Sequence, residues 1–538
     1  MISGNNSWPD ELTADMIKRK VSNKYIDTYP NLPNNLYDVL IQSAATCPTK
    51  IGIIDNYNRE YSYSQLVELV DEFSSYLHTI FGVKHSDHVA LMLYNSIEFC
   101  VAFLALCKLG AVTIPLPSKY KKNEVKSLAN KSDLNYIICD QDFYNWFVPY
   151  ENQNIRIIKS TNAKYGYGFS YLFPNYLAPV SSEGRYNDPT IIMFTSGTTS
   201  QSKGVLIKNY NIMHAIESYK RILGITCEDR SIIPIPIYHI TGLLALLSLF
   251  LYSKGTIYLH KSFDPQRVLT CIKENNITFI HASPTIFLLL LQQADNFLKL
   301  PSLTSFVCGS SNMPKEKLKQ IHEWLPNVNF YTVYGLTETT SPATIFPGDA
   351  STSEFIGSSG KPIPGIDCKI INEDGNEMPN TVVGEILVRG SVVLDSYYNT
   401  VSSDLNKNGW LKTGDLGYLN LQGYLFVVDR KKDMINRGGE KIWSFDVENE
   451  IYKIPGVNET SVIGIPDEIY GEVAAAVIRL TSDCILTEFE IKEALKTKLA
   501  KFKIPQRILI IKSIPKTLNG KVDKKAIRNL FKLEELRC

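Results

Sequence analysis

The chain has 538 residues, a length that allows about three or four structural units at roughly 150 residues each. Lys and Arg number 56 against 55 Asp and Glu, and the net charge of +1 gives no electrostatic reason to expect nucleic acid or an acidic membrane as a partner. The apolar stretches 99–107 and 243–251 are far shorter than the roughly 18 residues of a membrane-spanning helix.

The start of the chain and its cysteines both indicate a cytoplasmic protein. The first stretch of sequence lacks the apolar core of roughly 7–15 residues that a signal peptide requires. The 10 cysteines are scattered, with no CxxC pair and no histidine cluster at ligand spacing. Neither a zinc site nor a disulfide framework is therefore expected.

The first predicted elements form a βαβ unit. Residues 89–93 (VALML) are typical of a buried strand, residues 96–109 have helical spacing, and residues 110–117 return as a strand that ends at prolines. The alternation of β-branched runs with helical patterns continues and predicts an α/β fold. Residues 159–189 are rich in Tyr, Asn, Ser and Gly, and we expect an exposed connection there between two sub-lobes.

A loop dense in hydroxyl groups follows the next predicted strand, residues 190–194. Its sequence TSGTTSQSKG offers many donors to phosphate oxygens. The donors are Thr195, Ser196, Gly197, Thr198, Thr199, Lys203 and Gly204. The Walker pattern does not match, because Ser202 stands where it needs Gly and Gly204 where it needs Ser or Thr. The alternative interpretation is a flexible surface loop.

Six segments in order along the chain resemble the adenylate-forming superfamily of acyl- and aryl-CoA synthetases, adenylation domains and luciferases. The segments are 195–204, 334–338 (YGLTE), 413–415 (TGD), 429–435 (DRKKDMI), 437–440 (RGGE) and 519–521 (NGK). The resemblance covers almost the whole chain and implies an AMP-forming acid–thiol ligase that uses ATP and Mg²⁺. It also implies a large N-terminal domain of α/β sub-lobes, residues 1–429, and a small mobile α+β C-terminal domain, residues 430–538.

The resemblance assigns nucleotide binding to residues that can neutralise and orient phosphates. Glu338 is the expected magnesium ligand, since a cation that bridges phosphate oxygens is usually held by one or two carboxylates. Tyr334 would lay its ring on the adenine, and Thr337 would bond the α-phosphate. Asp415, expected in a turn before a strand, would accept from both ribose hydroxyls, and Arg430 would add bonds nearby. Taken singly, each of these residues has an ordinary surface, turn or core interpretation.

Acid activation and thiol capture make opposite demands on one site. The first needs a cation against the carboxylate, and the second needs an open approach for a pantetheine arm. Members of the family rotate the small domain about a hinge, which falls on Lys432 here. Lys521, after an Asn-Gly turn signal, would bridge the carboxylate and the α-phosphate. Gly438 and Gly439 would let the pantetheine approach closely, although they also suit an ordinary turn between strands.

Residues 236–243 (PIYHITGL) and 308–314 (CGSSNMP) are expected to bind the acid, and both are mostly uncharged. Neither offers the Asp that holds the ammonium in amino-acid-activating relatives, so an amino acid substrate is disfavoured. His239 would face the carboxylate, and with Lys203 and Lys521 it is a candidate catalytic residue. The candidate lining residues are His239, Thr241, Gly309 and Ser310.

Two subgroups of the family compete for the substrate. Residues 8–12, 116–118 and 435–441 resemble dihydroxybenzoate-activating enzymes of siderophore pathways, but those follow the pocket histidine with Asn where this chain has Ile240. Residues 238–240 and 195–199 are instead similar to fatty-acyl and coumarate-type CoA ligases, so an apolar acyl or aryl acid is expected.

The acceptor expected for that acid is coenzyme A. A carrier-protein phosphopantetheine arm acting in trans is the alternative. A nucleotide-binding protein without turnover and a luciferase-type oxygenase are the further alternatives.

Overall fold

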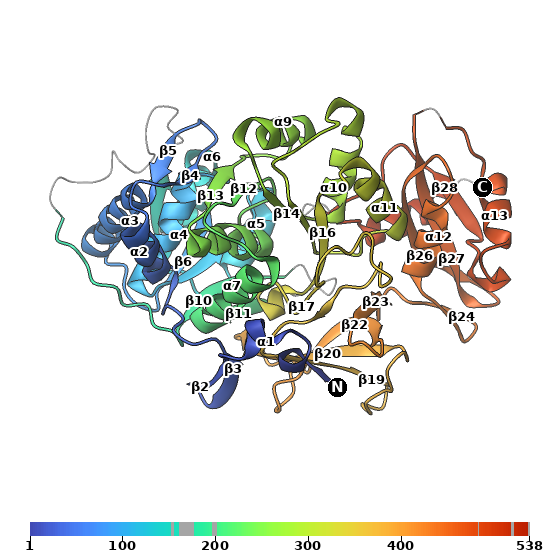
Figure 1. Cartoon of the computed structure of the whole chain (residues 1–538), viewed down its shortest axis with the longest axis horizontal. Coiled ribbons are helices and arrows are strands. Elements are labelled where there is room, and N and C mark those ends of the chain that lie inside the picture. Colours follow the sequence, from blue (N-terminus) through green and yellow to red (C-terminus); the bar gives the residue numbers. More distant parts are fainter. Residues whose placement is uncertain (152–154, 161–176, 196–201, 483, 518–520, 536–538) are drawn as a thin grey trace.

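A computed structural model describes the chain except for residues 152–154, 161–176, 196–201, 483, 518–520 and 536–538. The N-terminal part fills the left and centre of Figure 1, and the C-terminal part, drawn in red, forms a smaller body at the right. This mixed α/β architecture, with a large N-terminal and a smaller C-terminal domain, confirms the predicted fold class. No helix of the described residues is long and apolar enough to span a membrane.

The predicted βαβ unit lies at the centre of the first large sheet. The parallel neighbours β6 (His88–Met92) and β7 (Val112–Pro115) are joined by α4 (Ile97–Leu109). The Ser96 side chain caps the start of α4, and Gly110 ends it with a φ of 67°. Beside them lie β21 (Tyr397–Tyr398), β11 (Gly204–Lys208), β10 (Pro189–Phe194), β8 (Tyr136–Asp140) and β9 (Arg156–Ser160), in the order β21-β11-β10-β7-β6-β8-β9.

The connection predicted between two sub-lobes joins two strands of this one sheet, so that expectation is wrong. β9 lies at the edge of the sheet and β10 lies beyond β8, β6 and β7. Packing across the whole domain, rather than local sequence, determines which strands become neighbours. The polar composition therefore predicted a connection here but not which strands it joins. Most of the connection, residues 161–176, lies outside the described residues.

A second sheet continues the larger domain. Its order is β18 (Lys361–Pro362), β17 (Thr344–Ile345), β16 (Asn329–Tyr334), β15 (Ser305–Cys308), β14 (Phe279–Ala282), β12 (Arg230–Ile233), β13 (Thr256–Leu259), β4 (Ile51–Ile54) and β5 (Glu60–Ser62). One apolar core runs from this sheet through a helical layer to the first sheet. The helices of this layer are α2 (Leu36–Thr46), α3 (Tyr63–Tyr76), α4, α7 (Asn209–Leu223) and α8 (Leu249–Ser253).

The remaining helices of the larger domain lie outside this layer. A separate core beneath α5 (Lys122–Ala129) and α6 (Gln141–Glu151) covers the other face of the first sheet. The further helices are α1 (Asp10–Thr13), α9 (Pro265–Asn275), α10 (Pro284–Leu291) and α11 (Lys315–Trp324).

A third, antiparallel sheet lies at the bottom of Figure 1 and leads to the smaller domain. Its order is β1 (Ile2–Ser3), β19 (Ile366–Ile371), β20 (Gly384–Gly390), β22 (Leu411–Leu419) and β23 (Leu425–Arg430). The N-terminal hairpin of β2 (Ile17–Val21) and β3 (Lys24–Thr28) lies apart from it.

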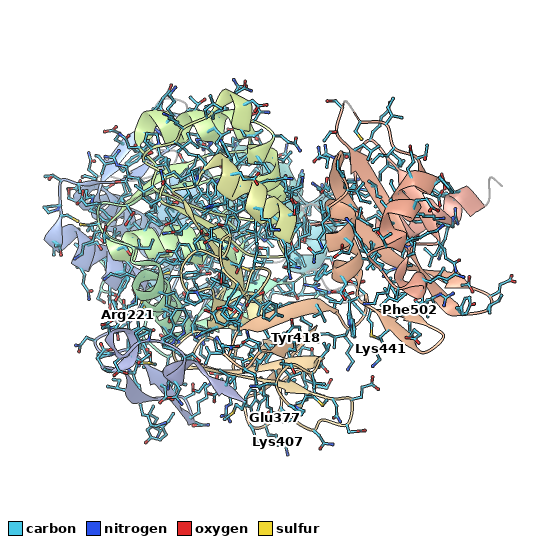
Figure 2. All side chains as sticks on the ribbon, turned by 45° about the vertical axis from the view of Figure 1, so that its right-hand side comes forward. Arg221, Glu377, Lys407, Tyr418, Lys441 and Phe502 are labelled. Atoms are coloured by element: carbon cyan, nitrogen blue, oxygen red, sulfur yellow. The ribbon has the colours of Figure 1, made fainter. Side chains whose placement is uncertain are left out.

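The smaller domain is built on the long hairpin of β26 (Val457–Asp467) and β27 (Gly471–Leu480). Because successive side chains of a strand point to opposite faces, Val462 and Ile463 belong to two different cores. The sheet is completed by β24 (Ile435–Arg437), β25 (Glu440–Ile442) and β28 (Arg507–Ile510), and its helices are α12 (Ser444–Tyr452), α13 (Glu488–Lys496) and α14 (Lys524–Glu535). Figure 2 labels Lys441 and Phe502 in this domain and Tyr418 in the larger one.

Candidate active site

Three predicted nucleotide-binding residues meet where the second and third sheets adjoin. Tyr334 ends β16, and Asp415 of β22 pairs in register with Arg430 of β23. The Tyr334 hydroxyl donates to Asp415 Oδ2 at 2.8 Å, and Arg430 Nε lies 3.3 Å from Asp415 Oδ1. Burial raises the pKa of Asp415 and of the Tyr334 hydroxyl, so the tyrosine stays a donor.

Asp415 lies inside a strand rather than in the predicted turn, which corrects that expectation. Gly414 has a φ of 72° in the middle of β22, where the strand bends without ending. The Thr413 hydroxyl accepts from the Asp415 N–H at 3.1 Å and donates to the Ile386 carbonyl at 2.9 Å. The carboxylate is therefore held on a strand whose backbone is fixed on both sides.

Glu338 lies in the short 3₁₀ turn Thr337–Thr339, so the two predicted phosphate-site residues are adjacent. The Tyr397 hydroxyl donates to Glu338 Oε1 at 3.4 Å. Burial raises the pKa of Glu338, while Tyr397 and Lys203 lower it. Because burial outweighs these partners, the carboxylate lacks compensating positive charge, and a bound Mg²⁺ would supply it. Among the described residues no group of three or more His, Cys, Asp or Glu could hold a metal, so such an ion would also need phosphate or water oxygens.

The two ends of the hydroxyl-rich loop meet at the hairpin of β10 and β11. The Thr195 N–H donates to the Lys203 carbonyl at 3.1 Å. Lys203 Nζ donates to Asp404 Oδ2 at 2.6 Å and to Ser402 Oγ at 3.0 Å, and it lies 5.2 Å from the ring centre of Tyr397. Lys203 therefore joins the group around Glu338. The predicted donors Ser196, Gly197, Thr198 and Thr199 lie outside the described residues.

Lys521 of the smaller domain faces this group. The Thr517 N–H donates to the Lys521 carbonyl at 2.7 Å. Burial and the positive charge of Arg430 lower the pKa of the Lys521 ammonium to about 8, while Asp415 and Glu338 act in the opposite direction. The residue as a whole is nonetheless solvent-exposed. The structure brings Lys521 together with the two carboxylates predicted to serve the nucleotide.

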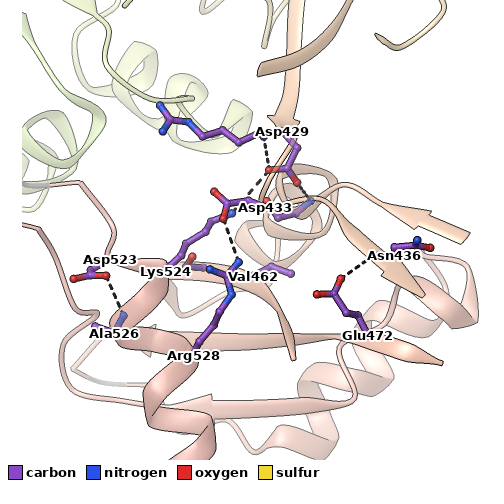
Figure 3. A network of polar contacts seen from close by, with 12 residues as sticks. Asp429, Asp433, Asn436, Val462, Glu472, Asp523, Lys524, Ala526 and Arg528 are labelled. Carbon is purple, nitrogen blue, oxygen red and sulfur yellow. Dashed lines mark hydrogen bonds and ion pairs between the residues drawn. The ribbon is translucent and has the colours of Figure 1, made fainter. Parts of the chain in front are cut away.

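Contacts from the smaller domain flank the predicted hinge, Lys432, on both sides (Figure 3). Before it, Asp429 Oδ2 accepts from the Ser444 N–H of α12 at 2.6 Å, and Lys524 Nζ of α14 lies 4.0 Å from Asp429 Oδ1. After it, Arg528 of α14 donates to Asp433 Oδ1 at 3.1 Å. Burial and Arg430 lower the pKa of Lys432. A hinge at this residue and a boundary between residues 429 and 430 remain predictions.

Gly438 and Gly439 form the two-residue turn between β24 and β25. Their φ angles are 58° and 95°, a conformation that favours glycine. The Gly438 N–H donates to the Tyr470 carbonyl at 2.8 Å, and the Arg437 guanidinium lies 3.5 Å from the ring centre of Tyr470. No recorded contact among the described residues joins this turn to the Asp415 group, so its role toward pantetheine remains a prediction.

The two predicted acid-binding segments follow strands of the second sheet. The ring of His239 lies 4.6 Å from that of Tyr238, and Thr241 begins a π-helix, Thr241–Ser248. Ser310 adopts a φ of 73° after β15. A Cβ atom on Gly309 would lie only 3.3 Å from His281 Nε2, so the imidazole packs closely beneath the second segment.

Two groups of residues near the site carry no recognisable signal in the sequence. His281 is fully buried, and desolvation lowers its pKa to about 3, so it is neutral. Single histidines in a β-branched run carry no distinctive pattern. Tyr397, Ser402 and Asp404 stand in a polar segment without periodicity, and only the fold brings them to Lys203.

Matches to known protein families and relatives cover most of the chain. The family model described as AMP-binding enzyme matches residues 40–398, and the model of the AMP-binding enzyme C-terminal domain matches residues 446–521. The long-chain-fatty-acid–CoA ligase FadD13 of Mycobacterium tuberculosis is 29% identical over 487 residues, which cover 87% of this chain and 93% of that protein. The 2-succinylbenzoate–CoA ligase of Oceanobacillus iheyensis is 31% identical over 486 residues, covering 90% and 97%.

Solved structures of other proteins also superimpose on most of this chain. ATP-bound MatB from Rhodopseudomonas palustris superimposes with a TM-score of 0.84 at 25% identity, covering 93% of this chain and 99% of that one. MenE from Bacillus subtilis in complex with ATP and magnesium gives a TM-score of 0.80 at 28% identity, with the same coverage. The resemblance predicted from six short motifs is confirmed, and the chain belongs to the family of AMP-binding enzymes.

Proposed function

We propose that this enzyme activates an apolar acyl or aryl acid with ATP and transfers the acyl group to coenzyme A. Its class is that of the AMP-forming acid–thiol ligases, which use ATP, Mg²⁺ and coenzyme A, because the relatives above are CoA ligases. The observation that carries the proposal is the approach of Lys521 to Asp415 and Glu338.

Each residue of the nucleotide group has a role in this reaction. Asp415 would accept from the ribose hydroxyls while Tyr334 and Arg430 hold its two oxygens in place. Glu338 would hold Mg²⁺, which neutralises phosphate charge as pyrophosphate leaves. Lys203 would approach the phosphates from the closed end of the loop.

Lys521 would act in the first of two steps. A carboxylate oxygen of the acid attacks the α-phosphorus, and the bond from that phosphorus to the pyrophosphate oxygen breaks. The Lys521 ammonium would stabilise the charge on the attacking carboxylate and the α-phosphate. In the second step the thiolate of coenzyme A attacks the acyl carbon, and AMP leaves with the bonding electrons. Lys521 is not needed there, which suits a small domain that moves between steps.

The residues predicted to line the acid site favour an uncharged acyl group as substrate. His281 beneath Gly309 is neutral, because burial lowers its pKa to about 3. Residues 236–243 contain no acidic or cationic side chain other than His239. A second charge on the acid would lose its hydration without a partner in these segments. The relatives do not support a carrier protein as acceptor, and we therefore do not propose one.

Pyrophosphate exchange with a panel of aliphatic and aromatic acids tests the proposal. An apolar acid should promote incorporation of labelled pyrophosphate into ATP, and coenzyme A should then convert that acid to a thioester. Amino acids should promote neither reaction. If no acid supports exchange in a protein that binds ATP, the proposed chemistry is wrong.

A further inference from the structure

We propose that Asp404 is a positioning residue that holds Lys203 for ATP and keeps it from pairing with Glu338. This inference rests on the proposed function, since it assigns the partner of a phosphate-binding lysine. Asp404 belongs to none of the six motifs. It lies nine residues before the Thr-Gly-Asp segment, in a stretch that only the fold brings to the loop.

The contacts of Asp404 are directed at a single ammonium group. Asp404 Oδ2 accepts from Lys203 Nζ at 2.6 Å and from Ser402 Oγ at 2.9 Å, and Ser402 Oγ lies 3.0 Å from the same Nζ. The Ser402 hydroxyl also accepts from the Asp404 N–H at 3.2 Å. An ammonium has three donors, so these two acceptors leave one for a phosphate oxygen.

Asp404 also determines which carboxylate pairs with Lys203. Glu338 is the other acidic group of the cluster, and Tyr397 lies between, with its hydroxyl on Glu338 and its ring beneath Lys203. Lys203 and Glu338 both contact Tyr397, so an ammonium released from Asp404 would be attracted to the nearby Glu338 carboxylate. Lys203 would then occupy the carboxylate that the magnesium ion needs. By holding the lysine, Asp404 leaves both Glu338 and the third donor available.

The backbone of Asp404 is tied to the ribose end of the site. Its carbonyl accepts from the Lys412 N–H at 2.6 Å, and a β-bridge joins Leu405 to Leu411. Three residues after Lys412 the same strand carries Asp415. One segment thus holds the partner of the phosphate lysine and the ribose carboxylate at a fixed separation, which suits a single nucleotide bound at both.

A double-mutant cycle on ATP affinity tests this assignment, and it needs no acid substrate. The Kd of the full-length protein for ATP with Mg²⁺ would be measured by isothermal titration calorimetry for the wild type, Asp404→Asn, Lys203→Ala and the double variant. We expect Asp404→Asn to weaken binding about tenfold, the loss typical of one charge-assisted hydrogen bond. In the Lys203→Ala background the same change should alter Kd less than about twofold, because Asp404 acts through the lysine.

A matched control and two contrary results complete the test. Asp395→Asn removes the carboxylate that pairs with Lys208, at the other end of β11, at 2.9 Å, and it should leave the Kd for ATP unchanged. If Asp404→Asn still weakens binding about tenfold without Lys203, Asp404 contacts the nucleotide or its metal directly and the inference is wrong. It is equally wrong if Asp404→Asn binds ATP as the wild type does. Failure of exchange in a wild type that binds ATP would remove only the proposed function, because the cycle is read from binding.

Discussion

The predicted nucleotide group of the larger domain and the two predicted functional segments of the smaller domain are held in different ways. Tyr334, Asp415 and Arg430 contact one another at 2.8–3.3 Å, from strands of two sheets. Lys203 and Tyr397, from the first sheet, join Glu338. These predicted nucleotide-binding residues of the larger domain are thus held in place by contacts within the protein.

Lys521 and the Gly438–Gly439 turn belong to the smaller domain, which has cores of its own. Lys521 reaches the nucleotide group only through the orientation of the whole smaller domain, and the glycine turn makes its recorded contacts within that domain. From this difference we expect ATP binding to depend on the fixed residues of the larger domain, and the choice between the two proposed steps to depend on the orientation of the smaller domain. The predictions below separate these two properties.

The largest effect is expected from Lys521→Ala. Loss of the ammonium should reduce acid-dependent pyrophosphate exchange by about 10²–10³-fold, the usual loss for one group that stabilises transition-state charge. The Kd for ATP should change little, because the contacts among Tyr334, Asp415 and Arg430 remain. Thioester formation from supplied acyl-adenylate should largely survive.

Lys512→Ala is the matched control, since Lys512 is also exposed and lies nine residues before Lys521. Exchange should be unchanged in this variant. Undiminished exchange in Lys521→Ala would show that the lysine is not used in the first step.

A smaller, step-specific effect is expected from Gly439→Leu. A side chain at this turn would obstruct a pantetheine arm and is strained at a φ of 95°. Thioester formation should fall by about 10²-fold while exchange stays near the wild-type rate, since the turn is remote from the first step.

The strain itself needs a control, which Gly423→Leu provides. Gly423 has a φ of 81° in the turn between β22 and β23 of the larger domain. If Gly439→Leu lowers exchange as much as thioester formation, the turn is structural rather than part of a thiol path.

Local sequence predicted the elements and motifs well where neighbours in the chain decide the structure. Ser96 and Gly110 mark the ends of one helix, and the motif residues Tyr334, Asp415 and Arg430 do come together. Prediction failed where contacts between segments distant in the sequence determine the structure. Asp415, predicted in a turn, lies in a strand that continues past Gly414, and the partner of Lys203 stands 201 positions away.

A third effect, about tenfold, should appear in the pH dependence of exchange. With a pKa of about 8, the Lys521 ammonium is charged below that pH and neutral above it. The rate should therefore fall about tenfold between pH 7 and pH 9, as the charged fraction does. Thioester formation from supplied adenylate should lack this decline, and exchange that stays constant across pH 8 would contradict the role of the ammonium.

The smallest effect concerns the stability of the smaller domain. Glu448 on α12 accepts from the Val462 N–H at 2.8 Å, and burial raises its pKa to about 7. The folded state therefore holds this proton more tightly than the unfolded state does, and the contribution of Glu448 to stability falls as pH rises from about 4.5 to about 7. Glu448→Gln removes the cost of ionisation and keeps an acceptor for Val462.

At pH 8 this substitution should therefore raise the free energy of unfolding by about 1–2 kcal/mol. At pH 5, where Glu448 is protonated, the gain should shrink, and thermal melts at both values measure the difference. Glu450→Gln, on the same helix and paired with Lys453 at 2.6 Å, is the control and should show no such contrast. A Glu448→Gln variant less stable at pH 8 than the wild type would mean that the charge pair with Lys524 outweighs burial. The stability of the smaller domain would then depend on the charged contacts of Lys524 near the predicted hinge as well as on its apolar cores.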